Sequence, residues 1–422
     1  MFHFDYDATG QLLAEEVPLQ KIAAELGTPT YVYAEATLTR HFRVYDQAFS
    51  AHSHLVCYAV KANTSGALLS LFASMGGGAD IVSGGELFRA LRAGVPTDRI
   101  VFSGVGKTAE EMQEALDAGI LSFNVESEPE LLLLDQVARA RGVQAPVALR
   151  VNPNVDAKTH PYIATGLKES KFGVPITEGR RLAELVVRSP GLRLTGLDCH
   201  IGSQLTKLGP TLEALDSVLA LADELRGAGH PLEHVDIGGG LGITYSGETP
   251  PHPDELGQAV TAKMKGRPEL LILEPGRVIV GNAGILLSRV LYVKETKDRT
   301  FLVLDAAMND LIRPSLYQAH HEIWPVERHP ERGNFTVDVV GPICESGDTF
   351  AKARTLPRLL AGELVAILSA GAYGFSMAST YNSRRRAAEV LVSGDRFCAI
   401  RARETYESLV AGETLPPWQR GA

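Results

Sequence analysis

The sequence has 422 residues, of which 45% are hydrophobic and 22% are charged. These proportions exclude a disordered or collagen-like chain, and the length allows more than one domain with a substantial core. The formal net charge of −9 disfavours a nucleic-acid-binding protein, because such proteins carry a surplus or stripe of positive charge. No apolar run approaches the roughly 18 residues that a transmembrane helix needs.

The N-terminus and the cysteines indicate a cytoplasmic enzyme. The first residues, MFHFDYDATG, lack the basic start and the apolar stretch of a secretory signal. The four cysteines (Cys57, Cys199, Cys344 and Cys398) are scattered and form no CxxC pair, so they do not indicate a disulfide framework. We therefore expect a cytoplasmic protein that binds neither membrane nor nucleic acid, and we assign no metal ligands.

Residues 36–279 alternate between strand-like and helix-like segments. A helix-like segment at Ala36–Phe49 comes first, and eight apolar or β-branched runs follow it: His54–Val60, Ala79–Val82, Arg99–Phe102, Leu121–Val125, Pro146–Val151, Leu194–Cys199, His234–Ile237 and Leu270–Leu273. Seven amphipathic stretches separate these runs, and several end in glycine, as helices commonly do. Eight such units predict parallel strands in a (β/α)8 barrel of the TIM type, although an open doubly wound sheet is built from the same units.

The sequence pattern changes after about Val280, because helical periodicity fades there and strand-like stretches dominate. The predicted strands are Ile285–Val293, Phe301–Asp305, Phe335–Val340, Glu363–Leu368, Glu389–Val392 and Phe397–Arg403. They predict a second, mostly antiparallel β domain at residues 280–422. Residues 1–35 precede the barrel, and we expect this N-terminal segment to pack on the β domain.

Several chemically distinctive residues fall at the ends of different predicted barrel strands. Lys61 ends the first strand, His200 follows the sixth, Gly238–Gly240 follow the seventh and Glu274 ends the eighth. Catalytic groups of TIM barrels collect at the C-terminal ends of the strands. Taken singly, each residue has an ordinary explanation as a surface lysine, a structural histidine, a tight turn or an ion-paired acid. Their combination at one end of the barrel favours a functional site.

The residue types also indicate a kind of chemistry. Burial of Lys61 among apolar neighbours would favour its neutral amine, which suits Schiff-base formation. Backbone N–H groups of the glycine run can approach an anion such as a phosphate. The Glu274–Arg277 stretch combines a carboxylate and a guanidinium that could bind different parts of one ligand. In the β domain, the turn that carries Cys344 and the loops that carry arginine and tyrosine are by themselves more typical of packing or solvated residues.

Seven short motifs follow one another along the chain in this order: YAVKAN, HIGSQ, DIGGG, EPGR, RPSLY, CESGD and YNSR. In that order the chain resembles the pyridoxal-phosphate-dependent decarboxylases with an alanine-racemase-like barrel (fold type III), and within them most closely the diaminopimelate decarboxylase family. The resemblance runs from about Leu26 to Arg396 and so covers nearly the whole chain. One departure is Arg386-Ala-Ala, where the family has a proline-containing stretch, and it touches no proposed catalytic residue.

The resemblance implies pyridoxal 5'-phosphate as the cofactor. Lys61 is expected to bind it as a Schiff base, His200 to stack on its ring as a further catalytic residue, and Glu274 to pair with the pyridine nitrogen. The residues expected around the phosphate are Ser203, Gly239, Gly276, Arg277 and Tyr373. The related racemases place an arginine where Glu274 stands, so Glu274 argues for decarboxylation, which needs the stronger electron sink.

The resemblance further implies meso-2,6-diaminopimelate as the substrate, with L-lysine and CO2 as products. Arg277 and Arg313, with Tyr317, are expected to bind the distal carboxylate, and Glu345 the distal ammonium. Tyr373 is also expected to contact the substrate. Cys344 is expected to protonate the substrate carbon that loses CO2. In this family the CESGD loop reaches the neighbouring subunit's site, so the resemblance implies a homodimer with shared active sites.

Two alternatives stay open at this point. The chain could decarboxylate another basic amino acid, as enzymes of the ornithine or arginine type do, but these substrates lack a distal carboxylate. It could also be a non-catalytic relative. The joint presence of Lys61, Glu274 and Cys344 speaks against that second alternative.

Overall fold

A computed structural model describes residues 2–156 and 171–419 of the chain. The chain divides into two compact units: one comprises Leu38–Gly281, and the other joins Met1–Thr37 to Asn282–Ala422. We describe each unit by itself. In the two stretches that the model describes, no helix combines the length and apolarity of a membrane span.

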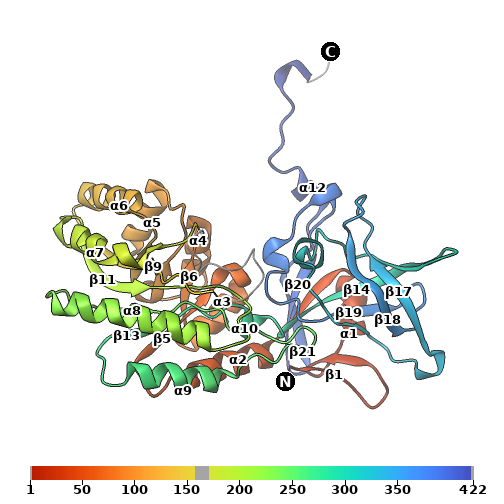
Figure 1. Ribbon diagram of the computed structural model, residues 1–422. Coiled ribbons are helices and arrows are strands. Elements are labelled where there is room, and N and C mark those ends of the chain that lie inside the picture. The colour runs from red at the N-terminus through yellow and green to blue at the C-terminus, as the bar shows by residue number, and fades with distance from the viewer. Residues whose placement is uncertain (1, 157–170, 420–422) are drawn as a thin grey trace. The chain divides into compact units, whose positions relative to one another are not determined.

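The unit Leu38–Gly281 contains a closed barrel of eight parallel strands, several of which are labelled in Figure 1. The strands are β5 (His54–Ala59), β6 (Gly78–Ile81), β7 (Ile100–Phe102), β8 (Ser122–Val125), β9 (Ala145–Asn152), β11 (Leu192–Asp198), β12 (His234–Asp236) and β13 (Leu270–Leu273). Each pairs in parallel with its neighbours, and the pairings of β8 with β9 and of β13 with β5 complete the ring. A short strand, β10 (Val174–Pro175), pairs with β9. The closed ring confirms the predicted barrel and excludes the open sheet.

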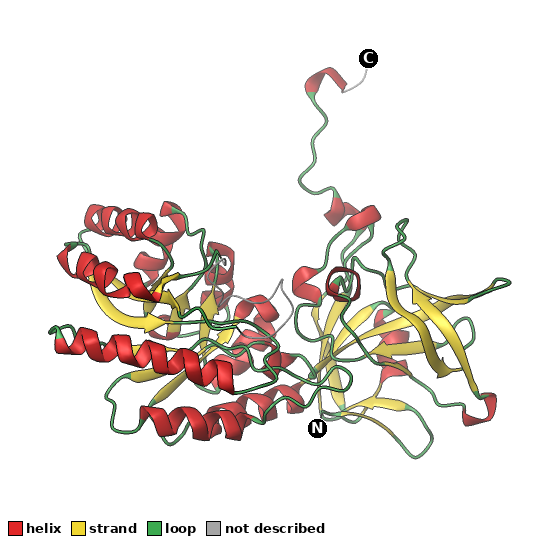
Figure 2. Cartoon of the chain, viewed as in Figure 1, coloured by secondary structure: helices red, strands yellow, loops and turns green. Residues whose placement is uncertain are grey.

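Helices connect consecutive barrel strands, so that helices and strands alternate along the chain (Figure 2). They are α3 (Gly66–Ser74), α4 (Gly84–Arg92), α5 (Ala109–Ala118), α6 (Glu128–Arg141), α7 (Gly179–Arg188), α8 (Gly209–Gly227) and α9 (Pro253–Met264), with α2 (Glu35–Ala48) before the first strand and the short α10 (Arg277–Val280) after the last. Local sequence explains their ends. Thr108 and Glu111 form a capping box at the start of α5, and Gly119 ends that helix in the left-handed conformation.

The other unit contains a mostly antiparallel sheet, as predicted. Its strands are β4 (Thr30–Ala34), β14 (Gly284–Glu295), β15 (Thr300–Leu304), β16 (Ile323–Pro325), β17 (Asn334–Val340), β18 (Thr349–Pro357), β19 (Leu364–Ile367), β20 (Ala388–Ser393) and β21 (Arg396–Arg401). Within the described residues, only the pairings of β15 with β17 and of β4 with β20 are parallel in this sheet. The strands β4, β16 and β18 were not predicted from the sequence. All five residues of β4 are buried, because this strand lies between β14 and β20.

Smaller elements complete this unit. The strands β1 (Phe4–Tyr6), β2 (Leu12–Ala14) and β3 (Val17–Pro18) form a small sheet, and the helix α1 (Leu19–Leu26) follows them. Apolar residues of β2 and α1 share one buried cluster with residues of β4, β14 and β20. Two short helices, α11 (Arg313–Tyr317) and α12 (Tyr406–Leu409), lie later in the chain.

Candidate active site

The C-terminal ends of the barrel strands carry the predicted site residues of this unit. Lys61 lies in a 3-10 turn directly after β5, His200 follows β11, Gly238–Gly240 follow β12, and Glu274 directly follows β13. Parallel strands in a closed barrel bring their C-terminal ends to one face, which is where active sites of this fold are built.

Lys61 is paired with a buried acid. Its Nζ donates to Oδ2 of Asp80 at 2.6 Å, and Asp80 lies on β6 with no exposed surface. The expectation of a purely apolar setting for the lysine is therefore wrong. The neighbouring barrel strand, β6, supplies this carboxylate, which holds the amine at the end of β5.

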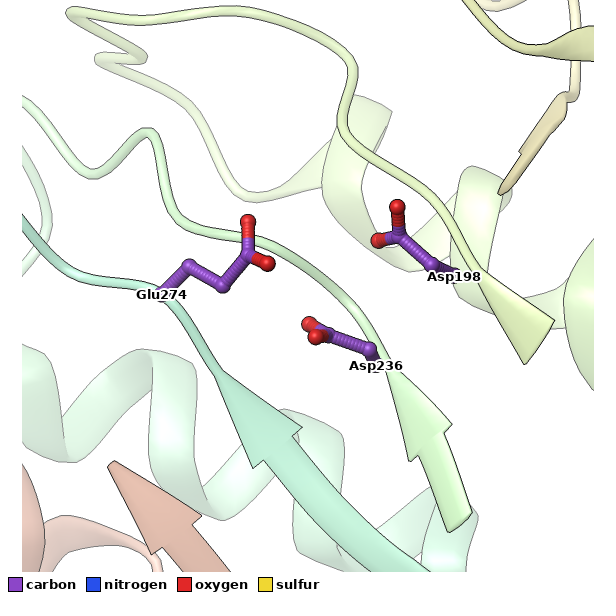
Figure 3. A group of neighbouring side chains, drawn as sticks. All are labelled: Asp198, Asp236 and Glu274. Atoms are coloured by element: carbon purple, nitrogen blue, oxygen red, sulfur yellow. The ribbon is translucent and has the colours of Figure 1, made fainter. Parts of the chain in front are cut away.

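Glu274 lies in a cluster of buried carboxylates with Asp198 and Asp236 (Figure 3). Oxygen atoms of the three side chains lie within 4.8 Å of one another. Burial raises the pKa of Asp236 to about 6. Burial and the neighbouring acids raise the pKa of Glu274 well above its usual range.

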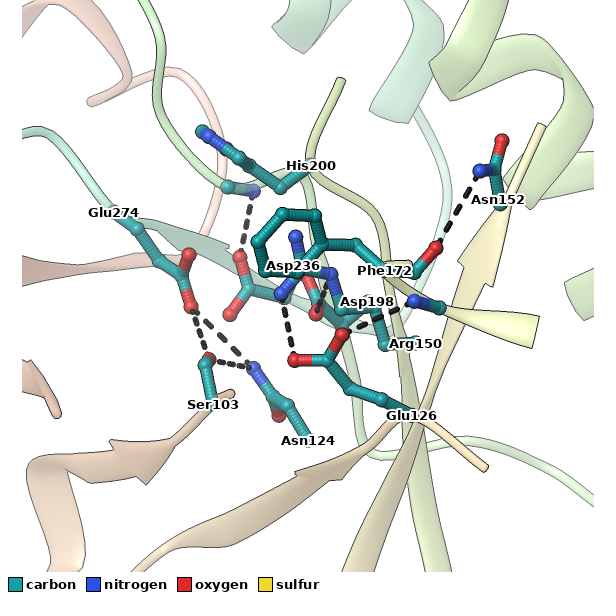
Figure 4. Close-up of polar contacts among 12 residues, drawn as sticks. Ser103, Asn124, Glu126, Arg150, Asn152, Phe172, Asp198, His200, Asp236 and Glu274 are labelled. Carbon is teal, nitrogen blue, oxygen red and sulfur yellow. Dashed lines mark hydrogen bonds and ion pairs between the residues drawn. The ribbon is translucent and has the colours of Figure 1, made fainter. Parts of the chain in front are cut away.

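When these acids are ionised, the surrounding groups compensate their negative charge only in part (Figure 4). Ser103 Oγ and Asn124 Nδ2 each donate to Oε1 of Glu274 at 3.3 Å. Arg150 is shared between two acids, because its Nη1 lies 2.8 Å from Glu126 and its Nε lies 3.7 Å from Asp198. Neither carboxylate oxygen of Asp198 accepts a hydrogen bond from the described residues. A cation beside Glu274, such as a protonated ring nitrogen or a metal ion, would match this charge.

His200 is held as a neutral ring against the glycine turn. The backbone N–H of Gly239 donates to His200 Nδ1 at 3.2 Å, so this nitrogen carries a lone pair. Burial and the nearby Arg150 and Lys61 hold the pKa of His200 well below its usual range. A Cβ added to Gly238 would lie 2.5 Å from the same nitrogen, and Gly238 has a φ of +65°. The position therefore requires glycine, both for its conformation and for the close approach of the ring.

Arg277 is fixed by two hydroxyl groups. Its Nη2 donates to Ser203 Oγ at 3.0 Å, and its Nη1 donates to Tyr245 OH at 2.7 Å. Gly276 lets this segment approach the lysine segment, because a Cβ there would lie 3.0 Å from Cβ of Ala62. A guanidinium, a hydroxyl and glycine backbone amides form a donor set suited to an anion.

The predicted residues of the other unit lie on one helix, one turn and one loop. Arg313 and Tyr317 lie on α11, Cys344 and Glu345 lie on the turn between β17 and β18, and Tyr373 follows β19. Ser315 Oγ of α11 donates to the carbonyl oxygen of Gly347 at 2.7 Å, which ties the helix to the turn. Arg313 is buried, whereas Cys344 and Glu345 are exposed.

Sequence reasoning gave no role to several polar residues that the structure places around Glu274, Lys61 and Arg277. They are Asp80, Ser103, Asn124, Glu126, Arg150, Asp198, Asp236 and Tyr245. One signal could have found most of them: these polar residues interrupt or end apolar barrel strands, where burial without a partner is costly. Tyr245 carried no such signal, since it lies in a loop.

The comparisons with known proteins agree with this geometry. Residues 35–281 match the family described as pyridoxal-dependent decarboxylase, pyridoxal binding domain. Diaminopimelate decarboxylase of Haemophilus influenzae is 50% identical over 405 residues, which cover 96% of this chain and 97% of that protein. Diaminopimelate decarboxylase of Helicobacter pylori, solved in complex with L-lysine, is 43% identical with a TM-score of 0.90, covering 93% of this chain and 98% of that one. The enzyme of M. jannaschii in complex with L-lysine is 38% identical with a TM-score of 0.93, covering 98% of each chain.

Proposed function

This chain belongs to the diaminopimelate decarboxylase family of pyridoxal-dependent decarboxylases, and from that premise we propose that it converts meso-2,6-diaminopimelate to L-lysine and CO2. The observation that carries the proposal is the identity of about 50%, over nearly the full length of both chains, with relatives of that name. The reaction would be the last step of lysine biosynthesis, and we place it in the cytoplasm.

The barrel residues fit pyridoxal 5'-phosphate. The incompletely compensated acids around Glu274 suit a protonated ring nitrogen, which we favour over a metal ion because this family uses pyridoxal. Lys61 would hold the cofactor covalently through its amine, and His200 would contact its ring. Ser203, Gly239, Gly276 and Arg277, with Tyr373, would bind its phosphate and immediate surroundings. When bound, the cofactor supplies an electron sink for the electron pair that remains when CO2 departs.

Glu274 would keep a proton on the ring nitrogen, and because its carboxylate is buried, the pairing would be stronger than in water. The neutral His200 would contact the ring without adding a second positive charge beside that nitrogen. Asp80 holds the Lys61 amine at the end of β5. Each of these residues thus has a separate task.

Recognition of the substrate would rest on its distal end. The guanidinium groups of Arg277 and Arg313, with the hydroxyl of Tyr317, would bind the distal carboxylate, and Tyr373 would also contact the substrate. Glu345 would accept the distal ammonium. Cys344 would donate its Sγ proton to the carbon that has lost CO2, so that a C–H bond replaces the C–C bond. Cys344 is exposed within its own chain, and we propose that it serves the active site of the partner in a homodimer.

A substrate panel tests the proposal. The purified protein, saturated with pyridoxal 5'-phosphate, is assayed for CO2 release from meso-diaminopimelate, L-ornithine, L-arginine and L-lysine. We expect efficient release from diaminopimelate alone. Comparable turnover of ornithine or arginine would overturn the substrate. A cofactor absorbance band without any turnover would indicate a non-catalytic relative.

A further inference from the structure

Arg313 makes a buried contact with a histidine that has no assigned role. Its Nη1 lies 2.7 Å from Nε2 of His321. Only 6% of Arg313 and 1% of His321 are exposed to solvent. The contact is therefore shielded from solvent, and the imidazole ring is one partner that holds the guanidinium.

The second ring nitrogen of His321 determines its protonation. Nδ1 lies 2.7 Å from the carbonyl oxygen of Leu368, which can only accept a hydrogen bond, so Nδ1 carries the proton and donates. The guanidinium of Arg313 can only donate, so Nε2 must offer a lone pair. The ring is therefore neutral, with the proton on Nδ1.

The main chain around His321 is also anchored. The N–H of Leu368 donates to the carbonyl oxygen of Glu322 at 2.8 Å, directly beside the paired strands β16 and β19. Arg354 of β18 donates to the carbonyl oxygen of His321 at 3.2 Å. The imidazole thus links Arg313 of the short α11 to the residue that follows the paired strand β19.

A neutral acceptor and a carboxylate have different effects on the charge of the guanidinium. An acid at this position would pair with Arg313 and cancel its charge at this contact, whereas a neutral imidazole orients the guanidinium without cancelling its charge. We propose that His321 is a positioning residue, which holds Arg313 in the orientation that binds the distal carboxylate of the substrate. This inference rests on the proposed function.

Two substitutions of similar size separate positioning from general stability. The amide of His321→Asn lies near the place of Nδ1, so it can donate to Leu368 but cannot reach Arg313. The amide of His321→Gln reaches the place of Nε2 and can accept from Arg313. The holoenzymes are compared in kcat and KM for meso-diaminopimelate, in thermal stability, and in competitive inhibition by L-lysine and by 1,5-diaminopentane. L-Lysine retains the distal carboxylate, because the reaction removes the other one, whereas 1,5-diaminopentane has no carboxylate.

We expect His321→Asn to raise the KM for diaminopimelate and the inhibition constant of L-lysine about tenfold, with kcat within about threefold of the parent. The reason is that the lost contact would stabilise bound substrate and transition state equally. Inhibition by 1,5-diaminopentane and the cofactor absorbance should not change. His321→Gln should stay within about threefold of the parent in every measure. An unchanged KM and L-lysine inhibition in His321→Asn would overturn the inference. Equal impairment of His321→Asn and His321→Gln, with weaker inhibition by 1,5-diaminopentane in both, would also overturn the inference.

A third variant covers the case in which His321→Asn does not fold. His321→Glu retains an acceptor for Arg313 but neutralises its charge, so L-lysine inhibition should weaken at least tenfold relative to His321→Gln. Equal inhibition of these two variants would overturn the inference. A parent enzyme that neither decarboxylates diaminopimelate nor binds L-lysine would instead refute the proposed function, before any variant is compared.

Discussion

The amine nitrogen of Lys61 lies 2.6 Å from Oδ2 of Asp80, whose side chain has no exposed surface. This ion pair joins β6 to the turn after β5 and fixes the end of the lysine side chain. It also means that removal of the lysine leaves a buried carboxylate without its cation, which destabilises a protein independently of any chemistry.

Two substitutions of Lys61 therefore have different expected effects on stability and the same effect on activity. Lys61→Ala and Lys61→Arg should both abolish turnover and the absorbance band of the lysine-bound cofactor, since neither side chain offers a primary amine. Lys61→Arg keeps a cation for Asp80 and should unfold at a higher temperature than Lys61→Ala. Lys263→Ala, which removes a lysine paired with the exposed Asp216, is the control and should retain both activity and absorbance. Turnover by either Lys61 variant would refute the cofactor assignment.

Gly238→Ala tests the contact between the glycine turn and His200. The added Cβ would lie 2.5 Å from His200 Nδ1, so the ring must move, and we expect cofactor affinity to fall at least tenfold in an absorbance titration. Gly229→Ala is the matched control, because Gly229 also has a positive φ, +89°, but has no atom within 4 Å of the added Cβ. If both variants lose affinity equally, backbone strain and not the ring contact is responsible.

Arg313→Ala tests recognition of the distal carboxylate. A charge-assisted contact contributes about 1.5–3 kcal/mol, so kcat/KM for diaminopimelate should fall about tenfold or more, with unchanged cofactor absorbance. Because Arg313 is buried, thermal stability is measured in parallel, and Arg313→Lys serves as a charge-preserving control. Full catalytic efficiency in Arg313→Ala would remove this residue from the substrate site.

Asp310 should make stability depend on pH. Burial raises its pKa to about 7 from an ordinary 3.8, so the folded state binds a proton that the unfolded state releases. This contribution is fully present below about pH 4 and is lost as the pH rises through 7. Asp310→Asn removes it, so the free energy of unfolding of the variant relative to the parent should rise by about 3 kcal/mol between pH 5 and pH 8. Urea denaturation at both pH values measures this difference, and a constant difference would contradict the assignment.

Subunit mixing tests whether active sites are shared. Lys61 and Cys344 belong to different units of the chain. If Cys344 serves the partner's site, a heterodimer of Lys61→Ala and Cys344→Ala chains has one site with both lesions and one site with none. Refolding a mixture of the two nearly inactive variants should then restore part of the activity. No recovery, with dimers confirmed by sizing and exchange confirmed by tagged chains, would rule out the shared site.

Much of the barrel was predictable because its signals are local. Each predicted barrel strand is a short apolar run bounded by polar or glycine residues, and helical periodicity identifies the stretches between the runs. The position of Lys61, His200 and Glu274 at strand ends then follows from the fold, since parallel strands end at one face. Their expected roles came from the order of the motifs and stay predictions until the variants are measured.

The sequence by itself determined the alternation of elements, the change to a β-rich region after Val280 and the strand-end location of the candidate residues. Only the tertiary structure decided that Asp80 partners Lys61, that Tyr245 holds Arg277 from 32 residues away, and that His321 accepts a hydrogen bond from Arg313. It likewise decided that β4 lies between β14 and β20. The physical reason is that periodicity reports which face of a segment is buried, whereas the partner across that face depends on strand register and loop closure between distant segments.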